Sequence, residues 1–109
     1  MSEKSFYFDP SARGIEVFLG PTEAILMKLV WRQKELTVKK ALYYLSEDNR
    51  LAYTTVMTVM ARLAEKGFLT REKDGRHFVY RPVMDRKGFI DERLKTVAAC
   101  LKRNFGTSL

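Results

Sequence analysis

A threonine-rich stretch carries the side chains best suited to specific chemistry. Thr54, Thr55 and Thr58 have hydroxyls that donate and accept hydrogen bonds, and Met57 lies between them. At helical spacing these residues share one face, and Arg62 follows one turn later. Small hydroxyl and methyl groups let a helix approach base edges in the major groove of DNA. This face therefore favours a helix that enters the major groove; the alternative is a solvated, threonine-rich face without a partner.

A helix over residues 54–66 would hold this polar face outward. Apolar residues recur on its other side at the spacing that buries one helix face, and these are Val56, Val59, Met60 and Leu63. Thr54 is expected to cap the first turn because its hydroxyl can accept an amide hydrogen bond. Lys66 and Gly67 are typical of the helix end.

Two strand-like runs follow, over residues 68–72 and 76–81. The turn Lys73-Asp74-Gly75-Arg76 between them contains the Asp-Gly dipeptide that is favoured in tight hairpins. Alternation places Phe78 and Tyr80 on the core side. The hairpin concentrates cations at Arg71, Lys73, Arg76 and Arg81, although such charges also keep an exposed hairpin soluble. Directly after a polar-faced helix, a basic hairpin favours contact with phosphates or a position beside the minor groove. The predicted DNA-backbone contacts are Arg62, Lys66, Arg71, Lys73 and Arg76.

The charge distribution agrees with this placement. The 109 residues carry a net charge of +7, which favours a polyanionic partner. Residues 1–36 hold five basic and five acidic side chains, whereas residues 37–66, 67–88 and 89–109 have net charges of +2, +3 and +2. The excess therefore begins where the predicted DNA-binding elements begin. The length fits one domain.

Other segments complete a mainly helical fold. A first helix is predicted to open at residues 20–22 and to bury Ile25, Leu26, Leu29 and Val30, and a second is predicted over residues 38–45 with Thr37 as its cap. Residues 51–53 are expected to add a short strand to the hairpin. Residues 1–18 form an arm whose aromatic residues, Phe6, Tyr7 and Phe8, should pack on the domain or on a second subunit. A minor-groove contact by Arg13 is a weaker alternative.

After Pro82 the pattern becomes helical again, with Asp85 as the predicted cap and an end near Phe105. Apolar residues follow at steps of four, three and four, the spacing of a narrow interhelical seam. Such a helix can fold back on its own domain, but pairing with a second chain is favoured because two DNA-reading heads fit a two-fold site. The predicted dimerisation residues are Ile90, Leu94, Val97 and Leu101.

Several function classes are disfavoured. His77 is the only histidine and Cys100 the only cysteine, and they lie far apart in the sequence, so no nucleophile and base can be paired. We expect no enzyme activity, no cofactor and no metal. A single cysteine permits no disulfide framework and favours a reducing, cytoplasmic location. The longest apolar run is interrupted by Lys28, and no signal sequence precedes it, so no membrane insertion is expected.

Several sequence blocks together resemble a known family. They read LGPTEAILMKLVW, AYTTVMTVMARLAEKGFL and GRHFVYRP, in this order. The chain is similar to the penicillinase-repressor family (BlaI/MecI/CopY type) over roughly residues 6–105. This resemblance implies a winged helix-turn-helix, a C-terminal helical dimerisation region and repression at a palindromic operator. It places base contacts on Thr54, Thr55, Met57 and Thr58, with Arg62 following and the hairpin cations Arg71 and Arg76 near the backbone.

The departures from the family pattern are also informative. Position 57 is basic in the staphylococcal members and is methionine here, which implies an apolar contact with a thymine methyl and a different operator. The copper-responsive branch has a cysteine-rich metal motif that this chain does not match. Members usually continue through further helices, so the chain is expected to be a short member or part of a longer protein. A membrane sensor protease is a candidate partner; Asn104-Phe105 resembles a cleaved bond but aligns upstream of it.

The sequence thus predicts three parts: an arm (1–18), a winged-helix DNA-binding domain (19–83) and a helical dimerisation segment (84–109). The fold class is mainly α with a small antiparallel β wing. The expected function is a homodimeric, sequence-specific repressor. The alternatives are a winged-helix module that docks on another protein and a nonspecific DNA-binding protein.

Overall fold

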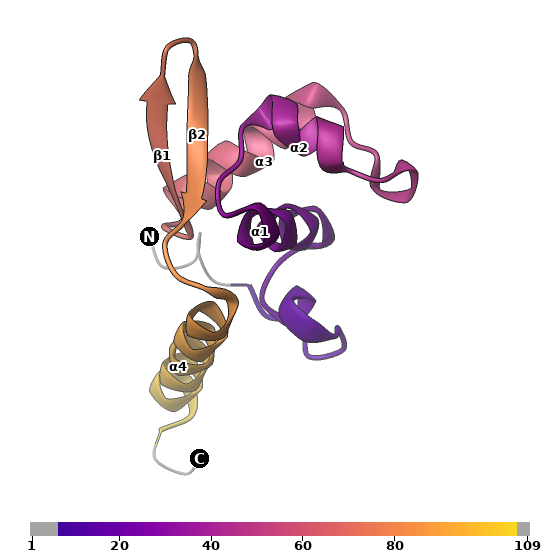
Figure 1. Cartoon of the computed structure of the whole chain (residues 1–109). Coiled ribbons are helices and arrows are strands. Elements are labelled where there is room, and N and C mark those ends of the chain that lie inside the picture. The colour runs from indigo at the N-terminus through magenta and orange to yellow at the C-terminus, as the bar shows by residue number, and fades with distance from the viewer. Residues whose placement is uncertain (1–6, 107–109) are drawn as a thin grey trace.

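The structure, a computed structural model, describes residues 7–106. In that range a short helix, η2 (Gly14–Val17), precedes a bundle of α1 (Pro21–Gln33), α2 (Val38–Tyr44) and α3 (Tyr53–Glu65). A turn of 3-10 helix, η3 (Glu47–Asn49), joins α2 to α3. The antiparallel strands β1 (Leu69–Asp74) and β2 (His77–Pro82) rise beside α3, and α4 (Arg86–Phe105) ends the described chain. Figure 1 shows the hairpin projecting from one end of the bundle while α4 leaves from the other.

Helix α1 begins where the sequence predicts. Pro21 occupies its first turn, and Glu23 folds back so that its carboxylate accepts a hydrogen bond from the Gly20 amide at 3.3 Å. Leu26, Leu29 and Val30 are buried as predicted, whereas Ile25 is only half-buried. Met27, which was not expected in the core, is buried in its place.

The next two helices have different starting signals. Thr37 caps α2 as predicted, since its hydroxyl accepts from the Lys40 amide at 3.1 Å. The prediction that Thr54 caps α3 was wrong: the helix starts at Tyr53, and Ala52 occupies the capping position without a side-chain bond. The inner face of α3 is confirmed, because Val56, Val59, Met60 and Leu63 are all buried.

The hairpin, hereafter the wing, differs from the prediction in its turn. Asp74 pairs with His77, so the first strand runs on to Asp74 and the loop consists of Gly75 and Arg76 alone. Gly75 supplies the positive φ of 66° that this tight loop requires. A third extended segment does join the wing, but it is not residues 51–53: Leu36 forms an antiparallel bridge with Tyr80. Residues 51–53 instead lead into α3.

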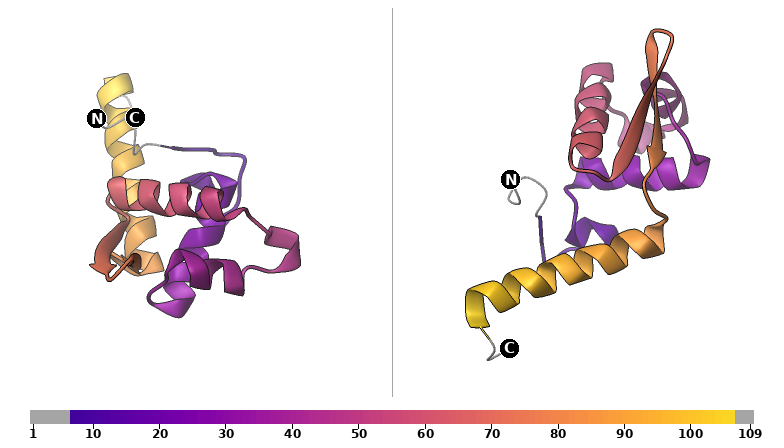
Figure 2. Two further views of the ribbon diagram at one scale, coloured as in Figure 1. Left: turned by 90° about the horizontal axis from the view of Figure 1, so that it is seen from above. Right: turned by 90° about the vertical axis from the view of Figure 1, so that its left-hand side faces the viewer.

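The arm before α1 contributes to the same core as the bundle. Ile15, Phe18 and Leu19 are buried, and the Asp9 amide donates to the Val17 carbonyl at 2.7 Å. Phe6 lies outside the described residues; Phe8 is partly exposed, with its ring 6.4 Å from that of Phe18. Residues 7–18 lie on the side of α1 away from the wing tip (Figures 1 and 2), which argues against a minor-groove role for Arg13.

Helix α4 is joined to the bundle at its beginning. The Asp85 carboxylate caps it, accepting from the Gly88 amide at 2.8 Å. The Phe89 ring packs between the rings of Trp31 and Phe68, at centroid distances of 5.4 and 5.1 Å. Trp31 also donates from its indole nitrogen to the Met84 carbonyl at 3.0 Å, which fixes the segment between β2 and α4. Figure 2 shows the rest of α4 extending past the bundle.

Candidate nucleic-acid interface

The outer face of α3 is accessible along its whole length. Thr54, Thr55 and Thr58 are exposed, and 44% of the surface of Met57 is accessible. The four predicted base-contact residues thus lie on one side of a helix whose other side is anchored in the core. Their contact with bases stays a prediction, but nothing in the described fold covers them.

The beginning of α3 suits an approaching anion. No side chain caps its first turn, and that turn contains no acidic residue. The exposed amides at a helix start carry a partial positive charge, which favours negative groups nearby. Tyr53, the first residue of α3, is 55% exposed at this end and was not predicted to take part.

The wing separates its charges onto two faces. Partners in the β1–β2 register share a face, so Arg71, Lys73 and Phe78 lie on the same side as the buried Leu69 and Tyr80. This side turns towards α3. The carboxylates of Glu72 and Asp74 lie on the other side, because they alternate with the cations along β1. The cations of β1 therefore point towards the same space as the outer face of α3.

A cleft of about 740 Å³ separates α3 from β1. Ala61, Ala64 and Leu69 line it with small or apolar groups, while Arg62 on α3 and Arg71 on the wing contribute a cation from each side. Met57, Thr58 and Glu65 complete the lining. The small alanine side chains help to keep the cleft open between the helix and the wing.

Lys66 is engaged within the fold, which argues against its predicted role as a DNA-backbone contact. Its ammonium group forms an ion pair with Glu23 on α1, with Nζ 2.8 Å from Oε2. The side chains are only 15% and 10% exposed, respectively. Because this pair is nearly buried, separating it to reach a phosphate would leave Glu23 uncompensated. Lys66 therefore joins α3 to α1.

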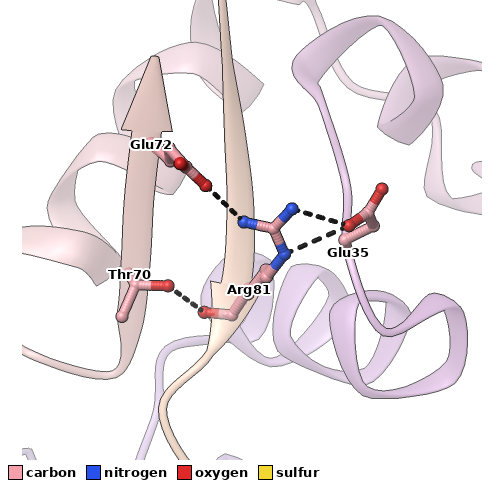
Figure 3. Close-up of polar contacts among 4 residues, drawn as sticks. All are labelled: Glu35, Thr70, Glu72 and Arg81. Carbon is pink, nitrogen blue, oxygen red and sulfur yellow. Dashed lines mark hydrogen bonds and ion pairs between the residues drawn. The ribbon is translucent and has the colours of Figure 1, made fainter. Parts of the chain in front are cut away.

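Arg81 is also withdrawn from the basic surface, since it lies on the acidic face of the wing. Figure 3 shows its guanidinium between Glu72 of β1 and Glu35 of the α1–α2 loop. Its nitrogens lie 2.8 Å from a Glu72 oxygen and 3.0 Å from a Glu35 oxygen. The hydrogen bond to Glu72 raises the pKa of Arg81 above its ordinary value, and Glu35 adds to the rise. Arg81 therefore stays charged and connects the wing to the bundle.

The remaining wing cations are accessible. Lys73 lies on the cationic face of β1, and Arg76 lies in the loop at the wing tip; both are exposed. Arg62 and Arg71 are exposed as well, so four of the five predicted backbone contacts are accessible to a ligand. Their contact with phosphates stays a prediction.

Two residues near the cleft were missed or misplaced by sequence reasoning. Phe78 was expected in the core, but it is 38% exposed. The Arg71 guanidinium lies over its ring, 4.3 Å from the centroid. Strand alternation identified its face correctly but not its distance from the core, which ends at Tyr80. Glu65 is the second, an exposed acid in a cleft otherwise flanked by cations.

The predicted dimerisation residues do not form one exposed stripe. Val97 is buried with 9% exposure in the hydrophobic core, and Ile90 is half-buried against it. Leu94 and Leu101 are 53% and 40% exposed. Its burial argues against the prediction that Val97 lies in a seam between subunits. Val97 lies on the inner face of the helix with Phe89 and Arg93, and burial lowers the pKa of Arg93.

Among residues 7–106 no group of three or more metal-ligating side chains could hold an ion. Within the same range no helix has both the length and the apolar character to cross a bilayer.

The bundle, the helix with an accessible polar face and the adjoining hairpin define a winged helix-turn-helix. The family model described as penicillinase repressor matches residues 19–108. The chain belongs to the penicillinase repressor family.

Curated relatives support this assignment. The chain is 30% identical over 73 residues to the penicillinase repressor of Bacillus licheniformis, in a match covering 67% of this chain and 57% of that protein. It is 42% identical over 73 residues to the transcriptional regulator BlaI of Mycobacterium tuberculosis, covering 66% and 53%. The chain thus spans about half the length of the curated relatives it matches.

Solved structures agree on the fold. The solution structure of the DNA-binding domain of the repressor BlaI matches with a TM-score of 0.55 and 31% identity, over 62% of this chain and 82% of that one. The structure of the CopR repressor matches with a TM-score of 0.51 and 31% identity, over 72% of this chain and all of that one (100%). Both likenesses include the winged helix-turn-helix.

Proposed function

We propose that the protein is a transcriptional repressor that binds a palindromic DNA operator as a homodimer. The observation that carries this proposal is the accessible polar face of α3 beside a cleft with a cation on each wall. In each subunit α3 enters the major groove. Thr55, Thr58 and Met57 lie against base edges, and Thr54 lies at the groove entrance.

The accessible cations contact the DNA backbone and position the protein without reading the base sequence. Arg62 and Arg71 hold one phosphate backbone in the cleft, and Lys73 and Arg76 reach the neighbouring backbone from the wing. Lys66 and Arg81 take no part, because each is engaged with carboxylates of its own chain. Four accessible cations per subunit correspond to about eight neutralised phosphates in a dimer.

The second subunit is held through α4. Leu94, Leu101 and Phe105 are exposed apolar residues at steps of seven and four on this helix. Such spacing places them along one side, as in an interhelical seam. Two subunits joined in this way present two recognition helices to two half-sites. As a DNA-binding regulator in a bacterial family, the protein acts in the cytoplasm.

The test is a titration of the promoter of its own operon, beside a random duplex of equal length, at several salt concentrations. With about eight phosphates neutralised, log affinity should fall against log salt with a slope near −7. Between 50 and 200 mM salt this is a loss on the order of ten-thousandfold. A footprint should cover two half-sites related by two-fold symmetry.

The outcome distinguishes the alternatives. Salt-insensitive affinity would contradict a phosphate-based interface and favour a module that docks on protein. Equal affinity for both duplexes without a footprint would favour nonspecific DNA binding. The mass of the protein in solution, measured at micromolar concentration, tests the homodimer separately.

A further inference from the structure

Phe78 is a large aromatic residue near the wing tip that the core does not use. Phe78 is 38% exposed, whereas Tyr80, two residues later on the same face, is 2% exposed. Leaving a phenyl ring in water forgoes the free energy that its burial would provide. One charged group does use the ring: the Arg71 guanidinium lies 4.3 Å from its centroid.

The ring is held firmly because the strand beneath it is anchored at Tyr80. The Tyr80 amide and carbonyl bond to the Leu36 carbonyl and amide at 2.8 and 2.9 Å. The Phe78 ring packs at 6.5 Å from the Tyr80 ring. In the register Arg71 is opposite Tyr80, so its side chain reaches Phe78 diagonally on the same face.

Arg71 depends on such support because no carboxylate holds it. Within residues 7–106 Arg71 forms no ion pair, and Glu65, which lines the same cleft, is not bonded to it. A free arginine side chain would lose considerable rotamer entropy when fixed on a ligand. A guanidinium stacked on an aromatic face loses less, since its plane is already oriented.

We infer that Phe78 is a positioning residue that holds the Arg71 guanidinium in the cleft between α3 and β1, ready to receive a DNA phosphate. This inference rests on the proposed function. Phe78 carries no charge, so it acts on DNA binding only through Arg71. The cleft places Arg71 opposite Arg62, so a backbone phosphate seated there meets a cation from each wall.

The experiment is a double-mutant cycle on the full chain with a short mixed-sequence duplex at low salt. The probe need not be the operator, since a backbone contact acts on any sequence. The variants are Phe78→Leu, Phe78→Trp, Arg71→Ala and the double variant Phe78→Leu/Arg71→Ala. His77→Ala serves as the matched control because His77 is exposed, adjacent in sequence and on the opposite face.

The expected loss for Phe78→Leu is roughly two- to fivefold in affinity per subunit, the size of a cation–π contact at an exposed site. Phe78→Trp should restore binding because indole is the stronger partner for a cation. In the Arg71→Ala background the Phe78→Leu change should cost less than twofold. His77→Ala should not couple to Arg71.

Thermal unfolding of each variant separates positioning from folding. If Phe78→Leu weakens binding equally in both backgrounds, the ring acts on the wing as a whole and the inference is wrong. If Phe78→Leu has no effect in the wild-type background, Arg71 needs no support and the inference is also wrong. If the wild-type protein does not bind the duplex at low salt, the proposed function itself fails.

Discussion

The run Arg71-Glu72-Lys73-Asp74 alternates its charges one residue at a time, and a strand converts this alternation into two oppositely charged faces. Helical spacing would instead have brought opposite charges together on one side. The zero net charge of β1 therefore conceals a separation of charge between its two faces. The cationic face turns towards α3, where a phosphate would enter, while the acidic face holds Arg81 against the bundle.

Truncation of Thr58 and truncation of Arg76 should weaken different aspects of DNA binding. Thr58→Ala removes a hydroxyl from the outer face of α3, so it should relax operator preference by about fivefold with little effect on random DNA. Arg76→Ala removes a phosphate contact, so it should weaken all sequences alike and reduce the salt slope by about one per subunit. Competition titrations with operator and random duplexes measure both. Equal losses on both duplexes for both variants would reject this division of roles.

Lys66 should matter for stability and not for DNA. Lys66→Ala leaves the Glu23 carboxylate nearly buried without its cation, and the expected cost is about 1–3 kcal/mol in the free energy of unfolding. The salt slope of DNA binding should not change. Denaturant unfolding measures the first and a salt titration the second.

The double variant Glu23→Gln/Lys66→Met is the control for this prediction, because it removes both charges and should recover part of the loss. A lower salt slope in Lys66→Ala, with unchanged stability, would restore the original prediction of a phosphate contact.

Element boundaries were predictable where one side chain controls them. Thr37 and Asp85 cap α2 and α4 as expected, because a hydroxyl or carboxylate before a helix has few other local uses. At α3 two threonines follow Tyr53, and the sequence does not indicate which residue starts the helix. The third segment of the wing was misassigned for a related reason: the Leu36–Tyr80 bridge depends on how the α1–α2 loop folds back, which is a tertiary effect.

The sequence predicted which faces form the candidate site, but not which of the cations are paired with carboxylates of the same chain. Periodicity identified the outer face of α3 and the cationic hairpin. It could not show that Glu23 and Glu35, both distant in sequence, would engage Lys66 and Arg81. Ion pairs between separate elements depend on packing, and no local pattern encodes them.

Glu65 should lower the affinity for DNA because it places a negative charge in the cleft between α3 and β1. A DNA backbone seated there would be repelled at close range. Glu65→Gln keeps the shape and removes the charge, so it should raise affinity for every duplex by several fold, most strongly at low salt. Fluorescence anisotropy with operator and random duplexes measures the change.

Glu47→Gln is a matched control, since Glu47 is an exposed acid in η3 that does not line this cleft. A decrease in affinity for Glu65→Gln, or an equal increase for both variants, would show that Glu65 does not face the DNA.

The described molecule is elongated because only part of α4 packs on the bundle. Its radius of gyration is 15.0 Å, compared with about 13 Å expected for a compact chain of this length, and its longest dimension is 51 Å. The beginning of α4 is fixed through Phe89, whereas its later turns extend past the bundle (Figure 2). A helix that leaves its own domain in this way exposes apolar side chains that a second copy can cover.

The two apolar sides of α4 explain why sequence spacing grouped the buried Val97 with the exposed Leu94 and Leu101. Phe89, Arg93 and Val97 recur at steps of four and face the core, while Leu94, Leu101 and Phe105 remain exposed. A pattern of steps of four and three runs across both sides of the helix. Only the position of the bundle decides which side is internal.

Substitutions on the two sides of α4 should therefore have opposite consequences. Leu94→Lys and Leu101→Lys place charges where a second subunit would pack, so the dimer should dissociate while the fold of each subunit is kept. Val97→Ala removes buried methyl groups and should lower the free energy of unfolding by about 1–2 kcal/mol without a direct effect on association.

Analytical ultracentrifugation and thermal unfolding on the same samples separate these effects. Because one operator needs two recognition helices, dissociation by Leu94→Lys should also reduce operator affinity far more than affinity for a single half-site. Lys95→Glu, an exposed change next to Leu94 that leaves the apolar side intact, is the control for added or altered charge. A Leu94→Lys protein that still sediments as a dimer, together with a Val97→Ala protein that dissociates, would return the subunit interface to the inner side of α4 and would mean that the helix moves away from its own bundle when two chains meet.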